Sequence, residues 1–273
     1  MTLPIPGSFK RLAARMAGNV ACQRLLARNV AISHYLMGIG TGSSLASSGE
    51  SVLIERLAQG ALADQPLCIF DVGANVGHFI RLIIQRLDVP FHVHAFEPSQ
   101  PAYRMLCDNT KGHSNLTLNN VGLGKQPGTA DLYADQPGSS LASLYQRRLR
   151  HHGIEFKYSE KIRMDTLDDY CAAHAIQRID LLKLDVEGHE LDVLQGGTQL
   201  FRARRIRMVS FEFGNCNIDA RTFLQDFWYF FREQGMNGLF RITPSGYLTP
   251  IQKYDESHEQ FRTSNFLVTQ GTP

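Results

Sequence analysis

A glycine-rich turn at residues 71–77 is the first part of this sequence that could do chemistry. It reads Asp-Val-Gly-Ala-Asn-Val-Gly and follows the apolar run 67–70. A turn of small residues between a strand and a helix lets backbone N–H groups approach a ligand closely. A dinucleotide-binding loop would have glycine in place of Asn75, and Asp71 puts a negative charge at the mouth of the turn, which favours a cationic ligand over a diphosphate. A purely structural turn is the alternative.

Glu97 is the second candidate, because it follows the run 92–96, whose alternation predicts a strand. Its carboxylate would emerge at the same rim as the glycine turn, where it could accept hydrogen bonds from both hydroxyls of a ribose. Pro98 ends the strand, and Ser99 is predicted to cap the helix that follows. An exposed acid near a helix end is the alternative. Turn and carboxylate together predict a ligand that contains a nucleoside but is not a dinucleotide.

Lys183 is unusual because it lies in the apolar run 179–186, which predicts a buried strand. Alternate residues of a strand share a face, so Leu181, Lys183 and Asp185 should lie together. A buried ammonium group needs a carboxylate partner, and we expect Glu212 of the next predicted strand to be that partner. An ion pair that only stabilises the sheet is as compatible with this pattern as a catalytic role.

Asp185, Glu187 and His189 follow at the end of that strand, where open α/β sheets bind ligands. Any of them could accept a proton, and imidazole has the ordinary pKa best suited to a general base near neutral pH. Glu187 and Glu190 could instead merely favour the start of the next helix through its dipole. Asp185, Glu187 and Glu212 could hold a divalent ion together with a sugar diol, but we predict no bound metal.

These residues require a parallel sheet to position them, and the rest of the sequence predicts one. Apolar runs alternate with helical patterns from residue 67 onward, which is typical of a doubly wound, Rossmann-like α/β fold. We expect strands at 67–70, 91–96, 116–121, 179–186 and 206–213, a helix at 223–234, and an antiparallel pair, 239–243 and 266–269, at the edge.

An insert separates the third and fourth of these strands and could cover an active site. It contains predicted short strands at 129–133 and 162–164, a loop at 136–140 and a helix at 166–175. The basic run at 147–152 is expected to be solvated rather than part of a lid.

The first 49 residues differ in charge from the rest of the chain. The 273 residues include 28 basic and 26 acidic ones, but residues 1–49 contain five basic residues and no acid. Helical spacing at 8–37 predicts one or two amphipathic helices before a Gly- and Ser-rich stretch at 38–49. We therefore predict an N-terminal helical extension, residues 1–49, and a main domain, residues 50–273, that begins with a helix at 50–61. The extension could contact an acidic acceptor or a membrane surface, or form a homo-oligomer with a second subunit.

Composition argues against several classes of protein. The charge is too balanced for a protein that coats nucleic acid, so we expect no nucleic-acid partner. The five cysteines are odd in number and include no C-x-x-C pair, which favours reduced thiols in a cytoplasmic protein over disulfides or structural zinc. Residues 29–49 form the longest stretch without Lys, Arg, Asp or Glu, but their Gly, Ser and His content makes a transmembrane segment a poor interpretation.

The glycine turn with Glu97-Pro98 resembles the S-adenosylmethionine site of class I methyltransferases, and later segments resemble one subgroup, the FkbM-type methyltransferases. These segments are Arg163-Met-Asp-Thr-Leu-Asp-Asp-Tyr170, Ile179-Asp-Leu-Leu-Lys-Leu-Asp-Val-Glu-Gly-His-Glu190, Val193-Leu-Gln-Gly-Gly197 and Phe211-Glu-Phe213. Lys183-Leu-Asp-Val-Glu-Gly188 is the most specific part, and the resemblance covers about residues 50–270. It implies S-adenosyl-L-methionine as the cofactor and a cofactor site made of Asp71, Gly73, Ala74, Asn75, Gly77, Glu97, Ser99, Asn120 and Asp185. In that site Glu97 would bind the ribose, and Asn120 or its neighbours would approach the adenine.

The resemblance also implies O-methylation of a hydroxyl on a sugar, a glycan or another small natural product. A sulfonium methyl is already electrophilic, so the protein must hold the acceptor in line and remove its proton as charge develops. His189, Glu187, Asp185 and Glu212 are the candidate catalytic residues, and the identity of the base stays open. A non-catalytic cofactor-binding or scaffold module is the alternative function. An NAD-dependent enzyme is disfavoured by Asn75, and methylation of nucleic acid by the slightly acidic main domain.

Overall fold

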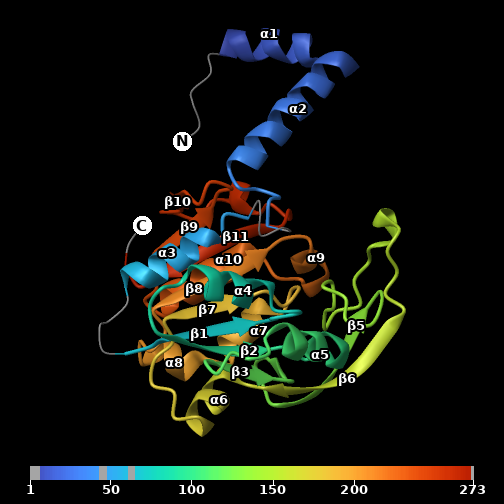
Figure 1. Ribbon diagram of the computed structural model, residues 1–273. Coiled ribbons are helices and arrows are strands. Elements are labelled where there is room, and N and C mark those ends of the chain that lie inside the picture. The colour runs from blue at the N-terminus through green and yellow to red at the C-terminus, as the bar shows by residue number, and fades with distance from the viewer. Residues whose placement is uncertain (1–6, 43–47, 61–64, 272–273) are drawn as a thin grey trace.

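The computed structural model describes residues 7–42, 48–60 and 65–271, and an eight-stranded sheet lies at its centre (Figure 1). The strands, in spatial order, are β10 (Leu248–Pro250), β9 (Gly238–Ile242), β11 (Ser264–Thr269), β8 (Met208–Phe213), β7 (Leu181–Leu184), β1 (Leu67–Val72), β2 (Phe91–Phe96) and β3 (Leu116–Asn119). The five strands from β8 to β3 are mutually parallel. β11 inserts antiparallel between β8 and β9. The predicted α/β class and the antiparallel edge are therefore confirmed.

Helices cover both faces of this sheet, because alternate residues of each strand point to opposite sides. On one face Ile69 packs with α3 (Ser51–Gln59), α4 (His78–Arg86) and α5 (Gln100–Asn109). On the other face Phe70 packs with α6 (Leu167–Ala173), α7 (Glu190–Gln195), α8 (Thr198–Arg202) and α10 (Leu224–Glu233). The two hydrophobic clusters form the layers of a doubly wound fold.

The aromatic helix predicted at 223–234 is α10, and its apolar side anchors the antiparallel edge. The Phe211 ring of β8 stacks on Phe227 of α10 at 4.7 Å between centroids and on Phe266 of β11 at 5.2 Å. Such aromatic pairs contribute about 0.5–1.5 kcal/mol each beyond the area they bury. This packing joins the last strand of the chain to the parallel part of the sheet.

The predicted insert forms a second, three-stranded sheet with the order β4-β6-β5. Its strands are β4 (Gly122–Leu123), β5 (Gly128–Ala134) and β6 (Tyr158–Asp165), and a short 3₁₀ helix, η1 (Arg150–His152), lies in the connection between β5 and β6. β3 ends at Asn119, earlier than expected, because the chain then leaves the main sheet and Gly122 pairs with Met164. In Figure 1 this sheet extends beside the carboxyl ends of the parallel strands.

The N-terminal helices α1 (Gly7–Ala17) and α2 (Val20–Leu36) project away from the sheet (Figure 1), and α2 has no buried residue. The chain after them returns to the main sheet: Ile39 is buried, and Arg241 Nε donates to the Met37 carbonyl at 2.8 Å. Gly38 has φ +78°, and a Cβ there would lie 2.2 Å from the Ile242 carbonyl oxygen. The packed part of the chain thus begins before residue 50, the start that we predicted for the main domain.

Parts of several sequence predictions lie outside the described residues: positions 1–6 of the N-terminal extension, positions 43–47 of the Gly- and Ser-rich stretch and the predicted helix end at residue 61. Two further short helices, α9 (Cys216–Ala220) and η2 (Glu256–His258), complete the described elements. Among the helices of residues 7–42, 48–60 and 65–271, none combines the length and the apolar character that crossing a bilayer requires.

Candidate active site

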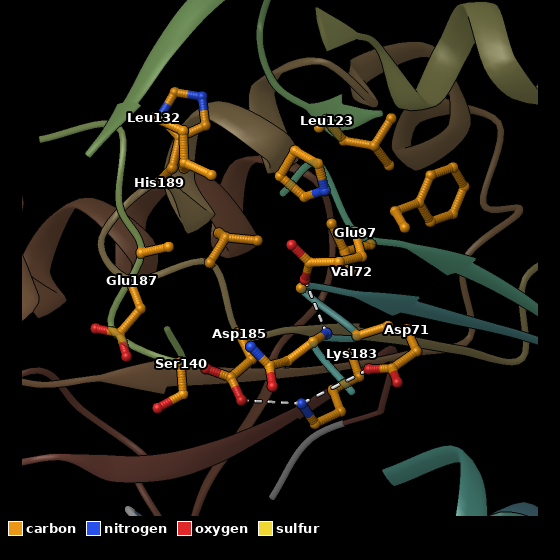
Figure 2. A pocket seen from close by; sticks show the side chains of 18 of the residues that line it. Asp71, Val72, Glu97, Leu123, Leu132, Ser140, Lys183, Asp185, Glu187 and His189 are labelled. Carbon is orange, nitrogen blue, oxygen red and sulfur yellow. Dashed lines mark hydrogen bonds and ion pairs between the residues drawn. The ribbon is translucent and has the colours of Figure 1, made fainter. Parts of the chain in front are cut away.

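A cavity of about 570 Å³ opens at the carboxyl ends of β1, β2 and β7 (Figure 2). Its size lies within the usual range of about 300–1,000 Å³ for small-molecule sites. The predicted residues that line it are Asp71, Gly73, Ala74, Asn75, Glu97, Asp185, Glu187 and His189. Leu132, Ser139, Ser140, Ile162 and Met164 of the insert line the same cavity. The insert therefore contributes to the site, as its position in the sequence suggested.

The glycine turn runs between the ends of β2 and β7. Its Gly73 and Ala74 N–H groups both donate to the Phe96 carbonyl at 3.0 Å. Gly73 has φ +84°, and a Cβ there would lie 1.8 Å from the Asp185 carbonyl oxygen, so the close approach of β1 and β7 requires glycine. Asn75 has φ +46°, a left-handed conformation that is uncommon outside glycine. Such strained backbone is concentrated at functional sites.

Glu97 is almost fully buried at the rim of this cavity, where it also holds the turn in place. One carboxylate oxygen accepts from the Asn75 N–H at 2.8 Å and the other from the Ser99 N–H at 2.9 Å. Burial raises the pKa of Glu97 to about 7, although these two N–H groups oppose the shift. Each oxygen keeps a lone pair that a ligand hydroxyl could use.

Three predicted cofactor residues, Ser99, Asn120 and Gly77, do not line the cavity, and their part in cofactor binding stays a prediction. Ser99 occupies the N-cap of α5, but its hydroxyl does not cap the helix: it donates to Glu160 of β6 at 2.7 Å, and Glu160 accepts from the Gln100 N–H at 3.1 Å. The Asn120 amide donates to the carbonyls of Glu97 and Pro98 at 2.9 and 3.0 Å.

Gly77, the third of these residues, has a packing role. It precedes α4, and a Cβ at this position would lie 2.8 Å from the Leu106 side chain of α5. The two neighbours of Asn120 in the direction of the insert, Val121 and Gly122, do line the cavity. Val121 and Gly122, rather than the Asn120 side chain, are therefore the residues for which contact with the adenine stays a prediction.

Lys183 does not pair with Glu212, so that prediction was wrong. Its ammonium nitrogen lies 3.2 Å from a carboxylate oxygen of Asp185 and 3.7 Å from one of Asp71 (Figure 2). The sheet register explains the difference: Lys183 stands directly beside Asp71 of β1, whereas Ser210 is its neighbour in β8. Of the two observed partners, Asp71 belongs to the glycine turn, and Asp185 lies two residues beyond Lys183 in the chain.

Negative charge exceeds positive charge around Lys183. Glu50, which the sequence offered no signal to find, is buried and lines the same cavity. Burial raises the pKa values of both Glu50 and Asp71, and Lys183 opposes both shifts. Burial alone would lower the pKa of Lys183, but Asp185, Asp71 and Glu50 together raise it, so the ammonium stays charged. Neither carboxylate oxygen of Asp71 has a hydrogen-bond partner within the described residues. A cationic ligand would compensate this charge.

His189 lies on the opposite wall of the cavity and has a carboxylate partner that the sequence analysis missed. Its Nδ1 is 3.2 Å from the Asp192 carboxylate, and the Tyr145 hydroxyl of the insert is 3.5 Å from the same carboxylate. The contact with His189 lowers the pKa of Asp192. The i, i+3 spacing of His189 and Asp192 was the available signal. A carboxylate beside Nδ1 can orient the imidazole ring.

Glu187 is bound to the insert through Arg147, which was expected to be solvated but is buried. Arg147 donates to the Glu187 carboxylate in a close ion pair and to the Asn215 side chain at 2.8 Å. The Ser143 hydroxyl donates to the Glu187 carbonyl at 2.7 Å. Burial raises the pKa of Glu187 to about 8, with Arg147 opposing the shift. Arg147 thus connects the insert to the end of β7.

Glu212 does not line the cavity, so the structure gives it no direct access to an acceptor there. Potential ligand atoms of Glu187, Glu212 and Cys216 lie within 4.8 Å of one another, the kind of grouping that can hold a metal ion. Burial raises the pKa of Glu212 well above its ordinary value, and Asp185, Glu187 and Glu190 raise it further. Because Arg147 already supplies positive charge to Glu187, this cluster does not need a metal for compensation, and the absence of a metal stays a prediction.

A parallel sheet in the order found here, with a glycine turn after β1 and a buried acid after β2, defines the Rossmann-like class of nucleoside-binding folds. Within this class the chain belongs to the FkbM methyltransferases. The family model described as "Methyltransferase FkbM domain" matches residues 71–236, which is more than half of the chain.

Curated relatives carry methyltransferase names. Methyltransferase sdnD of Sordaria araneosa is 30% identical over 154 residues, which cover 47% of this chain and 59% of the relative. The 2-O-methyltransferase NoeI of Sinorhizobium fredii is 26% identical over 165 residues, 57% of this chain and 67% of the relative. The hexuronic acid methyltransferase AglP of Haloferax volcanii is 25% identical over 167 residues, 61% of this chain and 64% of the relative. The chain thus spans about three fifths of the length of the curated relatives that it matches.

Proposed function

We propose that this protein is an S-adenosyl-L-methionine-dependent O-methyltransferase that acts on a hydroxyl of a sugar, a glycan or another small natural product. One observation carries the proposal: the carboxylates that line a cavity at the carboxyl ends of the parallel strands outnumber the cations beside them. Asp71 offers two oxygens without hydrogen bonds, and Glu97 offers lone pairs at the rim. Membership of the FkbM family supports the same cofactor.

The chain's residues fit this cofactor in charge and in hydrogen-bonding capacity. Asp71, Asp185 and Glu50 surround a single ammonium group, so they would hold the cationic methionine part of the cofactor. Glu97 would accept the ribose hydroxyls, and Val121 would lie near the adenine. When bound, the cofactor supplies an electrophilic methyl group on sulfur. The protein must then align an acceptor oxygen with that methyl and remove its proton.

His189 is the base that the geometry favours. It lines the cavity, its Nδ1 faces Asp192, and its Nε2 would be free to accept a proton from an acceptor hydroxyl. Glu187 is engaged by Arg147, and Asp185 by Lys183, so both would be positioning residues. Glu212 does not line the cavity, so we assign it no contact with the acceptor.

The acceptor class rests on the relatives. NoeI is named as a 2-O-methyltransferase and AglP as a hexuronic acid methyltransferase. These names support a hydroxyl of a saccharide as the acceptor for this chain. We propose the cytoplasm as the location of the reaction, a proposal supported by five cysteines that are all free.

A binding experiment followed by a transfer assay tests the proposed function. Calorimetry should detect S-adenosylhomocysteine binding to the wild type and its loss in Asp71→Ala and in Glu97→Ala. Methyl transfer from labelled cofactor to a panel of saccharides should then require His189. Unchanged cofactor binding in both variants would overturn the site. Tight cofactor binding without transfer to any saccharide or cell extract would support the alternative, a non-catalytic binding or scaffold module.

The N-terminal helices support a second proposal, a homo-oligomer. Leu25, Ile32 and Leu36 of α2 expose 59%, 51% and 66% of their surface, and with Cys22 and Asn29 they follow the a and d spacing of two heptads. Residues at this spacing form one stripe along a helix, which a second copy of α2 could cover.

A further inference from the structure

We infer that a second cavity beside the cofactor cavity is the acceptor subsite and that it selects a saccharide carrying a negative charge. This inference rests on the proposed methyl transfer. The second cavity has a volume of about 880 Å³, and its walls come from the insert, from α9 and from residues 261–263 before β11. Leu144 lines both cavities, so the two sites are adjacent.

Positive charge predominates around the second cavity. Arg148, Arg221 and Arg262 line it and are exposed, and no salt bridge within the described ranges involves any of their guanidinium groups. A guanidinium nitrogen of Arg262 instead lies 3.2 Å from Nδ1 of His34 in α2. His151 and His152 of η1 also line the cavity. Uncompensated guanidinium groups in a concave surface attract anions and raise their local concentration.

The one acid among the described lining residues is Asp219, which is partly occupied by the backbone of the insert. Its carboxylate accepts from the Arg148 N–H at 3.4 Å. The cofactor cavity has the opposite character, with Glu50, Asp71 and Asp185 around a single lysine. The two adjacent cavities carry opposite net charge, so the first would favour a cationic cofactor and the second an anionic acceptor. Each cavity would also disfavour the ligand of the other.

Aromatic and amide groups make a saccharide the best fit among anions. Tyr133, Tyr145 and Phe261 line the cavity together with Asn215. Phe261 is held by the core, since its ring centroid lies 5.4 Å from that of Phe213. Apolar ring faces and a few fixed polar groups are what a ligand with both C–H faces and hydroxyls requires.

Two contacts connect this cavity to the proposed reaction centre. Arg147 joins Glu187 of the cofactor cavity to Asn215 of the second cavity. Tyr145 of the second cavity has its ring 6.3 Å from that of His189, which lines the first. An acceptor in the second cavity would therefore reach toward the proposed base past Leu144.

The test compares acceptors that differ only in charge. Nitrophenyl glucuronide and nitrophenyl glucoside, with glucosyl phosphate as a second anion, are assayed for methyl transfer with the full chain. In the wild type, kcat/KM for the glucuronide should exceed kcat/KM for the glucoside. The ratio of these two values should fall about tenfold in Arg148→Gln and in Arg221→Gln, the effect of losing one hydrogen bond to a charged group. Arg104→Gln, an exposed residue of α5 outside both cavities, is the matched control and should keep the ratio. A response to glucosyl phosphate but not to glucuronide would assign the anion as phosphate.

The outcomes separate this inference from the proposed function. Equal transfer to charged and neutral acceptors, with the ratio unchanged in both arginine variants, would overturn the inference and leave the methyltransferase proposal intact. If no acceptor is methylated, saturation-transfer NMR on the protein with S-adenosylhomocysteine measures binding directly. Arginine-dependent binding of glucuronide or glucosyl phosphate would then support the anion site and contradict the proposed reaction. The absence of any such binding would overturn the inference as well.

Discussion

Replacing Lys183 by methionine tests the electrostatic centre of the proposed cofactor site. The substitution removes a buried cation while Asp71, only 1% exposed, stays in place 3.7 Å from the lost ammonium. At an effective dielectric constant of about 20, unit charges at that distance interact with about 4–5 kcal/mol. Removing one partner of a buried pair typically destabilises a protein by about 3–5 kcal/mol. Asp185 is 42% exposed and adds less, so we expect a loss of about 3 kcal/mol in the free energy of unfolding.

A double-mutant cycle measures how strongly Lys183 is coupled to Asp71 and to Glu212. Urea unfolding of Lys183→Met, Asp71→Asn and the double variant should give a coupling free energy of about 2 kcal/mol, because Asp71→Asn removes the carboxylate that the first substitution leaves unpaired. The same cycle with Glu212→Gln should give less than about 0.5 kcal/mol, since Glu212 makes no ion pair with Lys183 among the described residues. A larger coupling with Glu212 than with Asp71 would refute the register argument.

Three further predictions concern the ligand sites and the N-terminal helices. Burial raises the pKa of Glu97 to about 7, and we expect the ribose hydroxyls to need its ionised form, so the affinity for S-adenosylhomocysteine should fall as the pH drops below about 7. In calorimetry, Glu97→Gln should bind more weakly and with less dependence on pH. Binding to the wild type that does not change with pH would contradict this prediction. His189→Ala should lower kcat by about 10²–10⁴-fold with cofactor affinity unchanged, and Asp192→Asn should lower it less; full activity of His189→Ala would exclude it as the base. The double variant Leu25→Glu, Ile32→Glu should have the mass of a monomer in light scattering, where the wild type has the mass of an oligomer. A wild type with the mass of a monomer would contradict the proposed oligomer.

The sequence alone was sufficient for the fold class and for most polar groups of the proposed cofactor site. Alternation of apolar runs with helical patterns predicted the parallel sheet, and strand ends in such a sheet meet at one edge. The sequence therefore predicted that three residues lie close together before any distance was known: Asp71, Asn75 and Glu97. A glycine at position 73 fits the local turn, which the sequence predicted, but the close approach of the Asp185 carbonyl that leaves no room for a Cβ depends on the tertiary structure.

Contacts between distant segments were decided by the tertiary structure. Lys183 pairs with Asp71 because the register of β7 against β1 sets them side by side, and strand register is not visible in either segment by itself. Glu50 and Arg147 enter the site from elements far away in the chain, and nothing in their local sequence marks them as buried. A side chain's partner depends on which segments the fold brings within a few ångströms, so periodicity can predict the face on which a residue lies but not the residue that it meets.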